Sequence, residues 1–192
     1  MLTDPNLRNR SRLIEPPVLL KRLVSLRGPL TRQRVIFVMG RMLFLAAEEP
    51  NEPMLLEVNS PGGTKEHVMD ILRIMDRVGC GVATFCRREA RGTALVIAAH
   101  GLRGFRAALP ECRFSLSSSS ISGDAKPLPD ALLKILLKDV GSHSPPLLRS
   151  HKEPAEFDSL TALRNGLIDT ISPTPLYPGN AANLKPEATA KA

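Results

Sequence analysis

The stretch Glu57-Val58-Asn59-Ser60-Pro61-Gly62-Gly63-Thr64 decides the fold of this chain. Residues 54–58, which overlap the first two residues of this stretch, form a short apolar run that is typical of a buried strand. After the stretch, apolar side chains recur at spacings of three and four, which predicts an amphipathic helix. These side chains are Val68, Ile71, Leu72, Met75 and Val78. The Pro-Gly-Gly sequence therefore lies where a strand passes into a helix.

The two glycines of this turn are candidate binding residues. Glycine takes backbone conformations with positive φ and lets another group approach the main chain closely. Amides in the first turn of a helix have no partner within the helix and attract negative charge. We therefore predict that Gly62 and Gly63 form a shelf for a peptide or for an oxyanion. A plain turn without a ligand explains the same residues.

The composition is that of one folded domain. A chain of 192 residues with 43% hydrophobic residues can bury a sizeable core. It has no apolar run long enough to cross a bilayer and no apolar signal-peptide region at its start, so we expect no membrane attachment. Three cysteines without metal-ligand spacing predict buried, reduced thiols in a cytoplasmic protein. We expect no bound metal and no cofactor.

The positive charge is concentrated at the start of the chain. Residues 1–41 contain nine basic and two acidic residues, which gives +7 and equals the formal net charge of the whole chain. We predict a flexible basic arm over 1–17, a folded domain over 18–171 and a disordered tail over 172–192. Such an arm could contact nucleic acid or an acidic partner. We expect it to be solvated instead.

Strands and helices alternate between the arm and the tail. The expected strands are 19–26, 54–58, 82–86, 105–110, 112–116 and 167–171. The expected helices are 35–45, the segment after the Pro-Gly-Gly turn up to 78, and then 93–99, 130–140 and 158–166. This order predicts an α/β fold with parallel strands and right-handed helical crossovers. The helix over 35–45 is apolar nearly all round, so it should be buried in the core or against another subunit.

Other segments are expected to be irregular, or to end helices. Residues 87–92 are interpreted as a tight, charged turn, and 117–120 as a polar loop. Thr31 and Asp158 are suitable N-caps for the helices that follow them, and Gly166 is suited to the C-terminal end of the last helix.

Six short motifs follow one another along the chain. They are Gly28-Pro29-Leu30, Leu43-Phe44-Leu45, Asn59-Ser60-Pro61-Gly62-Gly63, Ala107-Ala108-Leu109-Pro110, Arg113 and Gly166-Leu167-Ile168-Asp169. Their order and spacing resemble those of one known family, the proteolytic subunit of the ATP-dependent Clp protease, over roughly residues 19–171. The resemblance implies a crotonase-like α/β fold with a mostly parallel sheet. It also implies a homo- or hetero-oligomeric ring with an inner chamber and an AAA+ unfoldase as partner, through which alone ATP would act.

Members of this family are serine peptidases, and the resemblance locates their triad on this chain. The nucleophile position falls on Arg91 or Gly92, the histidine position on Ser117 and the aspartate position near Pro154. Neither nucleophile candidate can attack a carbonyl, and serine cannot act as a general base near neutral pH. Thr93 has a hydroxyl, but its place at the helix start is expected to point it elsewhere.

We therefore predict a degenerate family member without the triad. The four histidines are His67, His100, His143 and His151, and none matches the family position. Such a subunit would be structural or regulatory in a ring beside active paralogues. The segment between the histidine and aspartate positions is shorter than in the family, so face-to-face stacking of two rings is in doubt.

Other interpretations remain open at this stage. The guanidinium groups of Arg87, Arg88 and Arg91 could bind a carboxylate or phosphate. They could equally be solvated or paired with Glu89. A second functional hypothesis is an active ATP-dependent serine-type endopeptidase that uses displaced residues. A third is a crotonase-like module that holds an acyl thioester on the glycine shelf.

Overall fold

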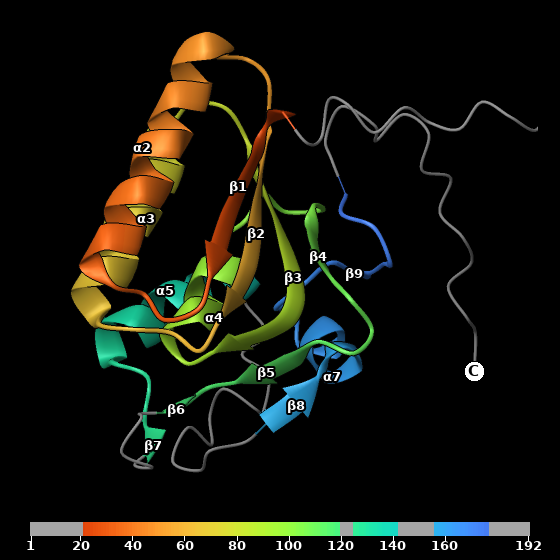
Figure 1. Cartoon of the computed structure of the whole chain (residues 1–192). Coiled ribbons are helices and arrows are strands. Elements are labelled where there is room, and N and C mark those ends of the chain that lie inside the picture. Colours follow the sequence, from red (N-terminus) through yellow and green to blue (C-terminus); the bar gives the residue numbers. More distant parts are fainter. Residues whose placement is uncertain (1–20, 120–124, 142–155, 177–192) are drawn as a thin grey trace, which may run out of the picture.

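The computed structural model describes residues 21–119, 125–141 and 156–176 (Figure 1). The expected arm over 1–17, most of the expected tail and Pro154 lie outside these residues. The described part forms a twisted sheet with helices α2 and α3 beside it and α4 and α5 behind its lower end (Figure 1). No described helix is both long and apolar enough to cross a membrane.

The main sheet is mostly parallel, as the sequence predicts. Its strand order is β1-β2-β3-β4-β9, with β5 pairing to β3 and β8 to β5. All of these pairs are parallel except β5 with β8. The strands are β1 (Leu23–Arg27), β2 (Met54–Ser60), β3 (Val82–Arg91), β4 (Arg106–Ala108), β5 (Arg113–Ser115), β8 (Glu156–Asp158) and β9 (Thr170–Ile171).

The helices begin at the caps that the sequence suggests. Thr31 accepts a hydrogen bond from the Arg34 amide at the start of α2, and Asp158 accepts one from the Thr161 amide in α7. Gly166 has φ 69° just beyond the end of α7, a conformation that glycine adopts without strain. The helices are α2 (Arg32–Glu48), α3 (Lys65–Arg77), α4 (Thr93–Ala99), α5 (Asp130–Val140) and α7 (Ser159–Arg164).

The core has two parts, because β2 is covered on both faces. The larger cluster includes Leu56 and the inward side chains of the helices, such as Ile71 and Leu95. The smaller cluster contains Leu55 and Phe85 with two alanines of the neighbouring strands. The first five residues of β2 are buried, as expected for a strand that reads as one apolar run.

Strand β3 corrects the prediction of a charged turn over 87–92. The strand continues to Arg91 because its second half pairs with β5, Glu89 lying opposite Arg113. A bulge after Val58 lets the same segment stay next to β2, where Ser60 lies opposite Ala90. The run of charges is therefore an extended strand at the sheet surface.

Two further predictions need correction near the end of the chain. The polar loop over 117–120 contains β6 (Ser118–Ser119), which pairs in antiparallel fashion with β7 (Ala125–Lys126). The expected tail does not begin at 172. The Ser172 amide donates to the Ala108 carbonyl, and Leu176 packs against the smaller core cluster. This pairing prolongs the contact of β9 with β4.

Helix α2 is buried on one face only. Val35, Val38, Met42 and Leu45 pack inward. On the outer side Phe37 is 69% exposed and Phe44 is 53% exposed, and Ile36 and Leu43 are also exposed. The prediction that this helix is buried in the core or against another subunit is therefore confirmed for its inner face, which lies in the core; burial against another subunit stays a prediction for the outer face. The outer face is an apolar surface on the outside of this chain.

Candidate functional site

The Pro-Gly-Gly turn follows β2 and leads into α3, as predicted. Gly62 has φ 98°, and a Cβ placed on it would lie 2.9 Å from the Arg91 carbonyl oxygen. A Cβ on Gly63 would lie 2.5 Å from the Cβ of Leu30. Leu30 donates its amide to the Gly62 carbonyl at 3.0 Å. Glycine is therefore required at both positions because other groups lie too close for a Cβ. These groups belong to this chain and not to a ligand.

The amides of this shelf already have acceptors. The Gly62 amide donates to Ser60 Oγ at 3.1 Å, and the Gly63 amide donates to Thr93 Oγ1 at 2.9 Å. The Thr93 hydroxyl in turn donates to the Gly63 carbonyl at 3.1 Å. Two expectations need correction: the shelf presents neither of these amides to a ligand, and Thr93 points at the shelf and not away from it. The reason is that the first turn of α4 lies directly against the Pro-Gly-Gly turn.

The turn between β3 and α4 is the second element of the site. Gly92 is the N-cap of α4 with φ 51° and ψ −118°, a conformation that side-chain-bearing residues adopt only under strain. Its amide donates to the Ser115 carbonyl at 2.8 Å. Sharp strand-to-helix turns of this kind expose a nucleophile in hydrolases. Of the two positions that the sequence analysis left open, Gly92 lies at the turn, whereas Arg91 is the last residue of β3.

Arg91 is held by two carboxylates. Its Nε donates to Glu89 at 2.8 Å, and a terminal nitrogen contacts Glu156 on β8. The interpretation that this arginine pairs with Glu89 is therefore confirmed. Glu156 lies two residues beyond Pro154, the expected aspartate position. These three side chains thus form an ion-pair cluster between β3 and β8.

Ser117, the position matched to the family histidine, takes part in a local turn. Its amide and its hydroxyl both lie 3.1 Å from Ser115 Oγ, and Ser115 is buried. Two hydroxyls bonded to each other supply no group that titrates near neutral pH. This pair can cap the end of β5 but cannot activate a nucleophile.

The two described histidines serve other contacts. His67 Nδ1 lies 2.7 Å from the Leu30 carbonyl oxygen, so this nitrogen carries the proton. His67 is half-buried, not a plain surface residue. Within the described ranges neither His67 nor His100 bonds a hydroxyl, and His143 and His151 lie outside those ranges.

His100 bridges three helices. Its Nδ1 lies 2.7 Å from Asp139 on α5, and its Nε2 lies 3.0 Å from Asp76 on α3. The hydrogen bond to Asp139 raises the pKa of His100, burial opposes this, and Asp76 adds to the increase. Both ring nitrogens of His100 therefore take part in contacts that join α3, α4 and α5.

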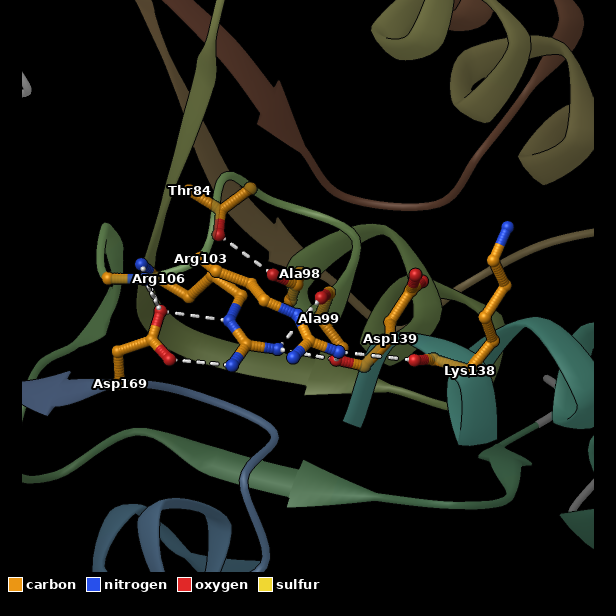
Figure 2. A network of polar contacts seen from close by, with 9 residues as sticks. Thr84, Ala98, Ala99, Arg103, Arg106, Lys138, Asp139 and Asp169 are labelled. Atoms are coloured by element: carbon orange, nitrogen blue, oxygen red, sulfur yellow. Dashed lines mark hydrogen bonds and ion pairs between the residues drawn. The ribbon is translucent and has the colours of Figure 1, made fainter. Parts of the chain in front are cut away.

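Arg106 and Asp169 form a buried pair that sequence reasoning missed (Figure 2). The Arg106 guanidinium donates to both carboxylate oxygens, at 2.6 and 2.9 Å. One of these oxygens also accepts the amides of Gly104 and Arg106. Although burial raises the pKa of Asp169, the hydrogen bonds and charge of Arg106 outweigh it and lower that pKa. The only sequence signal was the motif Gly166-Leu167-Ile168-Asp169.

The same network fixes the end of α5. Arg103 donates to the carbonyls of Lys138 and Asp139, and Arg106 donates to those of Ala99 and Asp139 (Figure 2). These carbonyls are the acceptors that a helix leaves unpaired at its C-terminus. Leu132 and Leu136 of α5 are buried in the main core. Helix α5 is therefore packed on its own domain.

Among the residues that the structure describes, no group of three or more histidine, cysteine, aspartate or glutamate side chains could hold a metal ion. The three cysteines are free and buried, as predicted. The hydrogen bond between Cys86 and Cys112, together with burial, raises the pKa of the Cys86 thiol well above its ordinary value.

The comparison with known protein families agrees with this architecture. The family model of Clp protease matches residues 9–174, which is most of the chain. The chain therefore belongs to the Clp protease family. The matched segment includes all six motifs from the sequence analysis, and the mostly parallel sheet with helical crossovers is the fold that they imply.

Proposed function

We propose that this family member is a proteolytically inactive subunit of an ATP-dependent Clp protease complex, with a structural or regulatory role in the ring. The observation that carries the proposal is the turn before α4. Gly92, the N-cap residue at that turn, is buried and has no side chain that could act as a nucleophile. The neighbouring hydroxyl, on Thr93, both accepts from and donates to Gly63.

The remaining positions support the same conclusion. Ser117 stands where the resemblance expects the base. Glu156, which is close in sequence to the expected aspartate position, pairs with Arg91, which also pairs with Glu89, and not with a histidine. Loss of the nucleophile or base of such a triad lowers kcat by about six orders of magnitude. Residual catalysis in such variants comes from the oxyanion site and binding. That contribution is small here because Gly63 has an internal acceptor.

The exposed face of α2 supports assembly into a ring. Ile36, Phe37, Leu43 and Phe44 place apolar surface outside the chain, and contiguous apolar patches are typical of subunit interfaces. Helix α5, in contrast, is packed against its own domain and does not project from it. We therefore propose contacts within one ring layer, with active paralogues or further copies of this chain, and no stacking that depends on α5.

The partner and compartment follow from this assignment. An AAA+ unfoldase would contribute all ATP chemistry, so the chain itself needs no cofactor. Free, buried thiols favour the cytoplasm, where such thiols stay reduced. Affinity purification of the tagged chain from its own cells, followed by size determination, should recover an intact peptidase subunit and an unfoldase. Recovery of the chain alone as a monomer would contradict the ring assignment.

Activity is tested with the pure protein and an active serine peptidase of the family as control. A fluorophosphonate should label the control stoichiometrically and this chain not at all. Short fluorogenic peptides should be cleaved by the control alone. If the chain does cleave them, the variants Thr93→Ala and Ser117→Ala decide whether displaced residues are responsible. Activity lost in either variant would contradict the proposal, whereas activity retained in both would indicate a contaminant.

The acyl-thioester hypothesis has less support from the geometry. A thioester carbonyl would need free amides on the glycine shelf, and both amides donate internally. Thermal melting with and without coenzyme A thioesters should show no shift. An increase in the melting temperature would favour the binding module over the ring subunit.

A further inference from the structure

A hollow lies at the carboxyl ends of the first three strands. It has a volume of about 450 Å³. In open α/β sheets, ligands bind at the carboxyl ends of parallel strands. The described residues that line this hollow are Gly28, Asn59, Arg88, Glu89, Arg91 and Arg113.

The charges around the hollow are not all compensated. Arg91 lies between two carboxylates, 2.8 Å from Glu89 and in contact with Glu156, so this cluster keeps one net negative charge. Arg88 and Arg113 are exposed and form no salt bridge within the part of the chain that the structure describes. Asp158, which lies opposite Arg113 in the β5–β8 pair, accepts the Thr161 amide at 2.8 Å; this hydrogen bond is the main cause that lowers the pKa of Asp158, and the charge of Arg113 adds the smallest contribution.

Arg87, which the sequence analysis grouped with Arg88 and Arg91, does not belong to the hollow. It faces Glu57 at 3.8 Å, and the same carboxylate accepts from Arg27 at 3.0 Å. Arg113 takes its place. It comes from β5, which the sequence order does not place beside β3 and which only the strand pairing brings there.

We propose that this hollow binds a small anion with two carboxylate or phosphate groups, held between Arg88 and Arg113. Guanidinium groups bind both kinds of oxyanion through paired hydrogen bonds. The side-chain amide of Asn59 adds a donor on the facing strand. The volume is in the range of small-molecule sites. The cluster of Arg91 with Glu89 and Glu156 keeps one net negative charge, which the two positive charges of Arg88 and Arg113 outweigh.

Binding is measured by isothermal titration calorimetry on the full chain at low ionic strength, with pyrophosphate and with citrate as probes. Arg88→Gln and Arg113→Gln should each weaken binding about tenfold or more, since each removes one charged hydrogen-bonding partner. Arg87→Gln removes the same charge one residue away, outside the hollow. It should change affinity by less than about twofold. Arg77→Gln, on the exposed end of α3, is a remote control with the same change in charge.

The controls separate a built site from general attraction to positive charge. Both substituted arginines of the hollow are exposed, so thermal melting should confirm that the variants fold as the parent does. An equal loss of affinity in Arg87→Gln or Arg77→Gln would overturn the proposal, as would unchanged binding in the Arg88→Gln/Arg113→Gln double variant. The proposal would also be overturned if neither pyrophosphate nor citrate bound.

The nature of the ligand is tested with hexaglutamate as a third probe. Binding of this peptide without binding of citrate or pyrophosphate would overturn the assignment to a small anion. The peptidase and ring experiments do not involve these residues, so this proposal and the proposed function can fail separately.

Discussion

Two polar regions of the molecule are built on different principles. Around Arg106 and Asp169, full charges neutralise each other inside the protein and join β4, α4, α5 and β9 (Figure 2). Around Gly63 and Thr93, the neutral hydroxyl of Thr93 forms hydrogen bonds with both the amide and the carbonyl of Gly63. The comparison teaches that stability depends strongly on the first region. The bonds between Gly63 and Thr93 are neutral hydrogen bonds, each of which contributes less to stability than a largely buried ion pair, so substitutions there should cost less.

The largest expected effect comes from breaking the charged region. Asp169→Ala leaves the Arg106 guanidinium, only 5% exposed, without its carboxylate. We expect a loss of about 3–5 kcal/mol in the free energy of unfolding, which is usual when one partner of a buried pair is removed. Urea denaturation measures it. Asp70→Ala, which breaks the exposed pair with Arg73, should cost less than about 1 kcal/mol. Similar losses in both variants would contradict the distinction between the two kinds of pair.

The second prediction concerns the close approach at the glycine shelf. Gly63→Ala should destabilise the protein by about 1–3 kcal/mol, because the new Cβ meets Leu30 at 2.5 Å. Gly40→Ala in α2 is the matched control. Its Cβ meets nothing within 4 Å, so it should stabilise the helix by roughly 0.5–1 kcal/mol. Chemical denaturation should show changes of opposite sign in the free energy of unfolding of the two variants. Unchanged stability in Gly63→Ala would show that Leu30 can move away from the new Cβ.

The third prediction concerns the neutral hydrogen bonds between Thr93 and Gly63. Thr93→Val removes the hydroxyl that bonds both the amide and the carbonyl of Gly63. We expect a loss of about 1 kcal/mol and faster hydrogen exchange of the Gly63 amide. Thr93→Ser keeps the hydroxyl and should retain the protection of that amide. Unchanged exchange in Thr93→Val would mean that another group protects Gly63.

The smallest expected effect is a pH dependence at the bridge between α3, α4 and α5. Because the pKa of His100 is raised in the folded state, its contribution to stability is complete below the unfolded pKa of about 6.5. It is lost as the pH rises through the folded pKa, when Asp139 and Asp76 lose their cationic partner. Unfolding free energies measured across this range should decline in the parent and decline less in His100→Gln. Parallel pH profiles would contradict the bridge.

Much of the candidate site could be predicted from local sequence. The strand, the glycine turn and the helix around Gly62 follow from spacing and from backbone freedom, and the ordered motifs indicate the family. The sequence also predicted, through the resemblance, that the nucleophile position falls on Arg91 or Gly92 and the histidine position on Ser117. These features depend on residues that are close together in the chain, so no distant contact was needed to recognise them.

Other features depended on contacts between distant segments. The extension of β3 to Arg91 requires β5 as a partner, and the pairing of β5 with β8 brings Glu156 to that arginine. The direction of Thr93 depends on how α4 packs against the turn after β2. Neither strand register nor side-chain direction at a helix start is fixed by the spacing of apolar residues.

By itself, the amino-acid sequence determined an α/β fold of the Clp protease family and the place of its glycine turn, and it led to the hypothesis that the catalytic triad is missing. Only the tertiary structure decided that the turn is closed by Thr93, that Arg106 and Asp169 neutralise each other, and that Arg88 and Arg113 share a hollow. Spacing along the chain fixes local backbone geometry, whereas hydrogen bonds and ion pairs between distant residues exist only once the strands have paired.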